Sequence, residues 1–119
     1  ITAVYTAQQT IKKMKNLNKK TKSIISIFAG RMSDVGKDPV PIFRQCVKLS
    51  KKYNKIEILW ASTREPYNFI PANQIGCDII TMPAGIIEKV SKFGKSFQSL
   101  TIDTVKKFLI DSKKSSFKL

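Results

Sequence analysis

Hydrophobic and polar residues alternate in blocks along this chain, and the blocks predict strands and helices in turn. Short apolar runs that suit buried strands occur at Ile1–Tyr5, Ile24–Phe28, Ile56–Ala61 and Asp78–Met82. Apolar residues at helical spacing predict helices over Ala7–Leu17, Asp38–Tyr53, Glu65–Gly76, Ala84–Val90 and Leu100–Ser112. Strand starts roughly twenty to thirty residues apart, with helices between them, indicate an α/β fold with parallel strands and helical crossovers.

The central run, Ile24–Phe28, is apolar except for Ser26, as expected of a strand that is buried on both faces. Because side chains alternate along a strand, Ser26 and Phe28 share one face. A hydroxyl there either looks into a site or is satisfied by a neighbour or a water molecule. A polar loop is expected next. It carries Arg31, which is either a site residue or a solvated surface charge.

Three further residues or groups refine the predicted helices. Thr6 is the expected N-cap of the first helix. Pro71 predicts a kink or an early break in the helix after the third strand. The last helix is expected to turn its apolar side inward. That side consists of Ile102, Val105, Phe108 and Leu109.

Composition is that of one globular domain: the chain has 119 residues, 42% of them apolar and 25% charged. No apolar run approaches the roughly 20 residues that span a bilayer, which excludes a membrane-spanning segment. Cys46 and Cys77 lie far apart, and no histidine accompanies them, so both are expected to be free thiols in a reducing compartment. Because Ile1 is not a methionine, the chain is expected to be processed, truncated or part of something longer.

The formal charge of +14, from 22 basic and 8 acidic residues, calls for an anionic partner. Nucleic acid and phosphorylated small molecules are the two candidates. Many lysines crowd one stretch, namely Lys12, Lys13, Lys15, Lys19, Lys20 and Lys22. No zinc finger, helix-turn-helix or RNA-binding strand motif accompanies them, which disfavours nucleic acid.

Polar side chains follow the predicted strands at their carboxyl ends, where parallel α/β proteins build their active sites. They are Thr6, Arg31, Ser62 and Arg64. Two guanidinium groups and a hydroxyl suit a phosphate monoester, although scattered surface arginines would give the same pattern. The chain has no histidine, which excludes serine–histidine and cysteine–histidine pairs.

Three segments then carry a family resemblance: ISIFAGRMSDVGKDP, ILWASTRE and GCDIITMP. In this order and spacing they resemble the C-terminal half of a transaldolase of the small, fructose-6-phosphate-aldolase-like subgroup. The resemblance runs from ITAVYT to the last helix. It implies that residues 1–119 form a single segment, strands five to eight of a TIM (β/α)8 barrel, with Ile1–Tyr5 as the fifth strand.

The resemblance implies a chemistry as well. Transaldolases transfer a dihydroxyacetone unit between sugar phosphates of the pentose phosphate pathway, through a lysine Schiff base and without metal or organic cofactor. The implied substrates are sedoheptulose 7-phosphate, fructose 6-phosphate, glyceraldehyde 3-phosphate and erythrose 4-phosphate. The implied location is cytoplasmic. Because a half-barrel leaves strand edges open, a second copy or the missing N-terminal half is expected as a partner, in a homo-oligomer.

By resemblance, the phosphate-binding residues fall on Arg31, Ser62 and Arg64. Ser26 matches the serine that contacts the Schiff-base intermediate, and Thr2 the threonine that helps to hold the catalytic water. Transaldolases carry phenylalanine at the position of Phe28, where fructose-6-phosphate aldolases carry tyrosine. Phe28 therefore favours transfer over aldol cleavage, unless it is simply a core residue.

One departure from the family pattern is large. The Schiff-base lysine and two acidic residues of earlier strands are expected upstream of Ile1, and no lysine of this chain lies within a predicted strand. The leading hypothesis is the C-terminal half of a transaldolase, with a fructose-6-phosphate aldolase-type lyase as the alternative. The second hypothesis is a non-catalytic half-barrel that binds phosphorylated ligands, and the third is a nucleic-acid-binding module.

Overall fold

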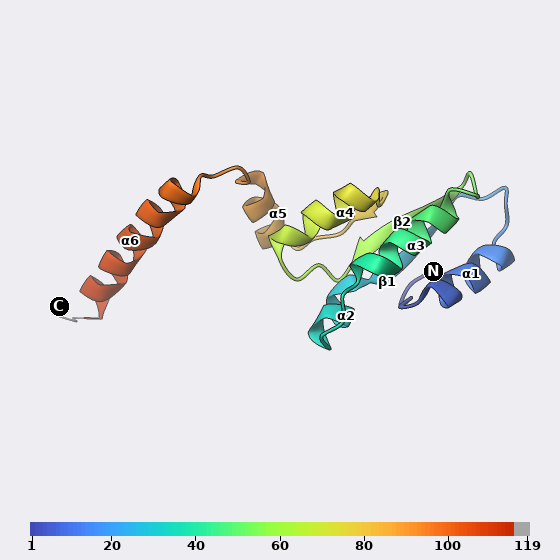
Figure 1. Cartoon of the computed structure of the whole chain (residues 1–119), viewed down its shortest axis with the longest axis horizontal. Helices are drawn as coiled ribbons and strands as arrows, with labels where there is room; N and C mark the ends of the chain where they lie inside the picture. The colour runs from blue at the N-terminus through green and yellow to red at the C-terminus, as the bar shows by residue number, and fades with distance from the viewer. Residues whose placement is uncertain (116–119) are drawn as a thin grey trace.

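The chain folds as alternating strands and helices (Figure 1). A computed structural model describes residues 1–115. Its elements are α1 (Ala7–Asn16), β1 (Ser23–Phe28), α2 (Ala29–Asp34), α3 (Val40–Ser50), β2 (Ile56–Ala61), the 3₁₀-helix η1 (Pro66–Asn68), α4 (Phe69–Ile75), β3 (Ile79–Ile80), α5 (Ala84–Ser91) and α6 (Phe97–Lys114). The predicted α/β class is confirmed, and the alternation is consistent with successive (β/α) units.

The strands form a parallel sheet in the order β1-β2-β3. In its register Ser26 lies opposite Leu59, and Leu59 lies opposite Ile79. Paired residues of neighbouring strands share a face, so these side chains form one row across the sheet. Ile27 and Trp60 form the row on the other face.

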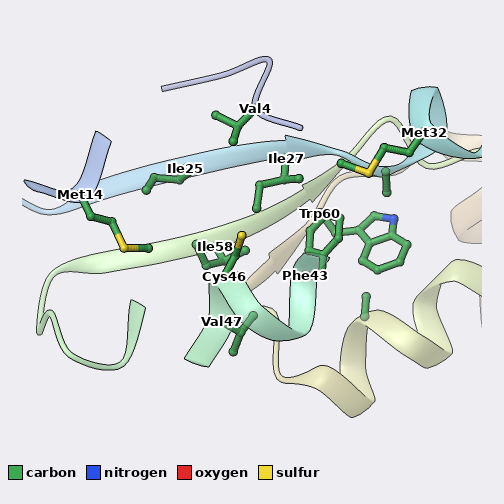
Figure 2. Close-up of a cluster of buried hydrophobic side chains, with 12 residues drawn as sticks. Val4, Met14, Ile25, Ile27, Met32, Phe43, Cys46, Val47, Ile58 and Trp60 are labelled. Atoms are coloured by element: carbon green, nitrogen blue, oxygen red, sulfur yellow. The ribbon is translucent and has the colours of Figure 1, made fainter. Parts of the chain in front are cut away.

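The core lies on the face of the sheet that α1, α3 and α4 cover (Figure 2). Its buried side chains include Ile25, Ile27, Ile58 and Trp60 from the strands and Met14, Phe43, Cys46, Val47 and Ala72 from the helices. The rings of Phe43 and Trp60 stack with centroids 4.3 Å apart. No helix within residues 1–115 covers the opposite, bare face: Ser26 and Phe28 are only half-buried there, and Ile24 is exposed.

The prediction of a regular strand over Ile1–Tyr5 is wrong. These residues run parallel to β1, joined to it by an isolated bridge between Val4 and Ile27. Phe28 N donates to Val4 O at 3.2 Å, and Ser26 N donates to Ile1 O at 2.8 Å. Ala3 has a φ of 58°, a left-handed conformation that interrupts the extended backbone. The segment therefore lies along the free edge of β1 as an irregular chain.

The helix boundaries confirm two of the local predictions. Thr6 caps α1 through a capping box, in which Gln9 N donates to Thr6 Oγ1 at 3.0 Å. The helix predicted over Glu65–Gly76 is divided into η1 and α4. Pro71 lies in the first turn of α4, where its missing N–H costs no helical hydrogen bond.

Two predictions about other elements are wrong. The loop expected to carry Arg31 is the short helix α2, which follows β1 directly. The apolar side of the last helix does not turn inward: Ile102, Val105, Phe108 and Leu109 are all exposed on α6, which extends away from the sheet (Figure 1). The pattern was correct for an amphipathic helix, but nothing else within residues 1–115 covers this side. No helix in this part of the chain is long and apolar enough to cross a membrane.

Candidate functional site

The C-terminal ends of β1 and β2 bring α2 against the loop of residues 62–65. The contact is made by Gly30, which is buried at the start of α2. A Cβ atom on Gly30 would lie 1.7 Å from the carbonyl oxygen of Ser62 and 2.8 Å from Cγ of Arg64. Only a glycine allows two backbones to come this close. This contact places the chain around Arg31 beside Ser62 and Arg64.

Arg64 reaches across to α2 and binds Asp34 with two hydrogen bonds. Its Nε donates to Oδ1 at 3.3 Å and its Nη2 donates to Oδ2 at 2.7 Å. The hydrogen bond from Arg64, together with the charges of Arg64 and Arg31, holds the pKa of the Asp34 carboxyl below its usual value. The same hydrogen bond raises the pKa of Arg64. Both guanidinium groups therefore act on one carboxylate at one edge of the sheet.

Arg31 is exposed and lies over an aromatic ring. Its Cζ is 5.6 Å from the centroid of Phe28, a distance at which the ring face attracts a cation. The Phe28 ring also packs edge-on against Tyr5, at a centroid distance of 6.0 Å. The ring therefore lies between the N-terminal segment and the first arginine of the site.

The loop after β2 is held in an uncommon conformation. Ser62 has a φ of 61°, in the left-handed region that is uncommon for residues other than glycine. The backbone N–H groups of Arg64 and Glu65 donate to Oδ1 of Asn68, at 3.3 and 3.4 Å, which ties the loop to η1. The hydroxyl of Thr63, the residue between Ser62 and Arg64, is buried and has no hydrogen-bond partner in the described part of the chain. Strain and an unpaired buried hydroxyl are features that collect at functional sites.

Ser26, Phe28 and Thr2, the residues predicted to act near the substrate carbonyl, lie on or beside the bare face of the sheet. Ser26 and Phe28 are half-buried on that face of β1. Thr2 is exposed on the segment along the edge of β1, next to the Ile1 carbonyl that accepts from Ser26 N. Sequence reasoning missed Gly30 and Asp34, although Asp34 follows Arg31 by three residues, which is one helical turn.

Other reactive side chains lie outside this constellation. Every lysine within residues 1–115 is exposed. Lys22 pairs with Glu57 at 2.7 Å, near the start of both strands, and this hydrogen bond raises the pKa of the lysine. Cys46 and Cys77 are free, as predicted. Burial raises the pKa of both thiols, that of Cys77 to about 12, which makes them poor nucleophiles.

A bare sheet face with basic side chains at the carboxyl ends of parallel strands is the arrangement in which α/β proteins bind anionic ligands. The family model described as Transaldolase/Fructose-6-phosphate aldolase matches residues 1–119. The chain belongs to this family, as its sequence motifs predicted.

The chain is also similar to individual proteins that are named probable transaldolase. The chain is similar to a probable transaldolase of Nitrosopumilus maritimus (strain SCM1), with 37% identity over 68 residues, which are 56% of this chain and 31% of the relative. It is 34% identical over 91 residues to one of Anaeromyxobacter sp. (strain K) and 33% identical over 92 residues to one of Caldicellulosiruptor saccharolyticus. Each of these two matches covers 76% of this chain and 40% of the relative. The chain thus spans well under half the length of these relatives.

Proposed function

We propose that this chain forms strands five to eight of a (β/α)8 barrel in a cytoplasmic transaldolase of the pentose phosphate pathway. The whole protein then transfers a dihydroxyacetone unit between sugar phosphates through a lysine Schiff base. Support comes from the family match and from the parallel order in which the N-terminal segment, β1, β2 and β3 lie side by side. The bare face with Ser26 corresponds, in this proposal, to the interior of the closed barrel.

The observation that carries the proposal is the contact of Gly30 with Ser62 and Arg64. It brings α2, which carries Arg31, against the loop that carries Ser62 and Arg64, at the carboxyl edge of the sheet. We infer that Arg31, Ser62 and Arg64 bind the phosphate of the sugar. Guanidinium donors match phosphate oxygens in pairs, and the hydroxyl supplies a further donor.

The remaining site residues are assigned to the carbonyl end of the substrate. Ser26 contacts the Schiff-base intermediate from the bare face, and Thr2 helps to hold the water that hydrolyses it. Phe28 offers an apolar ring in place of a phenol, so it cannot assist proton transfer to water. Transfer between sugar phosphates is therefore proposed over simple aldol cleavage.

A second candidate function, a phosphate-binding half-barrel without catalysis, is favoured by one observation. A Schiff-base lysine is normally activated by desolvation or by a neighbouring cation, and every described lysine is exposed. The two candidates share the same phosphate site. They differ in whether the complete protein supplies a catalytic amine.

Substitution of the arginines tests the phosphate site. Arg31→Ala and Arg64→Ala are each expected to weaken binding of fructose 6-phosphate roughly ten- to a hundredfold, because a charged hydrogen bond contributes about 1.5–3 kcal/mol. Titration calorimetry measures this effect, and Ser62→Ala should weaken binding less. Arg44→Ala is the matched control, since Arg44 is an exposed arginine of α3. Equal losses for Arg44→Ala and Arg64→Ala would argue against a defined site.

We also propose that the protein is a homo-oligomer in which the apolar side of α6 packs on a second copy. Exposed apolar residues follow this helix for most of its length: Phe97, Leu100, Ile102, Val105, Phe108, Leu109 and Ile110. Phe108→Ser with Leu109→Ser is expected to shift the protein to a smaller species in sedimentation velocity, because it removes apolar contact area. Lys106→Ser on the same helix serves as the control. A monomer before any substitution would contradict the proposal.

A further inference from the structure

Asp34 makes the structural link between α2 and the second arginine of the site. Its carboxylate accepts from Nε and Nη2 of Arg64 at 3.3 and 2.7 Å, so it binds the guanidinium from the side. A guanidinium group has five N–H donors, and this pairing occupies one on Nε and one on Nη2. Both donors on Nη1 and the second donor on Nη2 are left for another partner. One of the Nη1 donors and the free Nη2 donor form the end edge of the group, the edge with which arginine can also bind a phosphate in pairs.

We propose that Asp34 is a positioning residue, which holds the Arg64 guanidinium from the side so that its end edge faces the phosphate of the substrate. The inference rests on the proposed phosphate role of Arg64. Under it, α2 orients both arginines of the site. It carries Arg31 itself, and it fixes Arg64 through Asp34.

The surroundings of the pair support orientation over stability as its role. Both side chains are 51% exposed, and exposed ion pairs contribute little to the free energy of unfolding. The backbone beneath the pair is fixed, because Gly30 of α2 packs directly against Ser62 and the Cγ of Arg64. A long arginine side chain that is anchored at Cγ and at Nε keeps few conformations. Less conformational entropy is then lost when the phosphate binds.

Simple electrostatics gives the opposite expectation for the same residue. A carboxylate beside an anion site repels a phosphate, so its removal should tighten binding if Asp34 acted through its charge alone. If Asp34 positions Arg64, its removal frees the guanidinium and weakens binding. The sign of the change in affinity therefore decides between the two roles.

The test uses the complete natural polypeptide and inorganic phosphate as the probe, with the dissociation constant measured by titration calorimetry. Asp34→Asn keeps the shape of the side chain but removes its charge and one acceptor. It is expected to weaken phosphate binding about tenfold. Asp34→Glu keeps the charge but displaces the carboxylate, and it is expected to weaken binding as well. Glu88→Gln is the matched control, because Glu88 of α5 forms an exposed ion pair with Lys92, which follows the end of that helix.

The double variant with Arg64→Ala separates the possible outcomes. Once Arg64 is absent, adding Asp34→Asn should cause no further loss of phosphate affinity. In turnover assays Asp34→Asn should raise KM for a phosphorylated sugar about tenfold and leave kcat within about twofold. If Arg64→Ala weakens phosphate binding but Asp34→Asn leaves it unchanged or makes it tighter, the positioning role of Asp34 is wrong and the phosphate site stands. If Arg64→Ala itself has no effect, the phosphate site fails, and the inference fails with it.

Discussion

Replacing Gly30 with alanine is expected to destabilise the protein by roughly 3 kcal/mol and to abolish phosphate binding at the site. The added Cβ would lie 1.7 Å from the carbonyl oxygen of Ser62, which is backbone and cannot rotate away. Either α2 or the loop of residues 62–65 must shift, and such overpacking of a close contact costs about 1–3 kcal/mol or somewhat more. Urea unfolding measures the loss of stability. Calorimetric titration with phosphate measures the loss of binding.

Gly85→Ala is the matched control for this substitution. Gly85 also lies in a helix, α5, and a Cβ there would meet no atom within 4 Å. Alanine has the higher helix propensity, so this variant should unfold at the same or a slightly higher urea concentration. If Gly30→Ala and Gly85→Ala unfold at the same urea concentration, α2 and the loop of residues 62–65 do not pack closely at Gly30, and the prediction is wrong.

Strands β1 and β2 and the capped start of α1 could be predicted because their signals are local. The run Ile56–Ala61 predicts β2 with its observed bounds, and the prediction for β1 differs by one residue. The start of α1 follows from Thr6, whose hydroxyl caps it. These features depend on side chains and backbone within a few residues, so one sequence contains enough information to place them.

The elements that sequence analysis missed depend on distant parts of the chain. The short helix α2 has a weak apolar pattern, and the contact of Gly30 with Ser62 at the end of the neighbouring strand holds it in place. Ala3 has a left-handed backbone conformation that interrupts the predicted strand Ile1–Tyr5, and an alanine gives no sequence signal for such a conformation. The apolar pattern of α6 predicted an inward-facing side, but that side is exposed within residues 1–115, because a pattern does not say which surface covers it.

The residues of the candidate site also divide into those that local sequence signals predict and those that depend on distant parts of the chain. Arg31, Ser62 and Arg64 could be selected because each follows a strand end, and parallel strands deliver their ends to one edge. Asp34 could not be selected in this way, because a carboxylate repels a phosphate and is not expected beside its site. Its role becomes visible only when the two hydrogen bonds to Arg64 are seen. The roles of Arg31, Ser62, Arg64 and Asp34 toward a substrate are predictions, which measurements of phosphate binding test.

The catalytic amine of the proposed reaction can be located by its chemical requirements. A lysine attacks a ketose carbonyl only in its neutral form, and enzymes favour that form by desolvating the lysine or by placing another cation beside it. Every lysine within residues 1–115 is exposed, and Lys22 is bound to a carboxylate that favours its charged form. We therefore propose that none of the lysines within residues 1–115 forms the Schiff base, and that the catalytic lysine belongs to another part of the protein.

Borohydride reduction in the presence of fructose 6-phosphate is expected to trap one adduct in the complete protein, on a lysine outside residues 1–119. The same treatment of the 119 residues alone should leave their mass unchanged. Peptide mapping by mass spectrometry locates the modified residue, and a sample without borohydride controls for non-covalent binding. The expected difference is all or none, because only a neutral, positioned amine forms the imine that borohydride reduces. A stoichiometric adduct on any lysine of this chain would show that it carries the nucleophile itself. The assignment of Arg31, Ser62 and Arg64 to a site completed by another part of the protein would then be wrong.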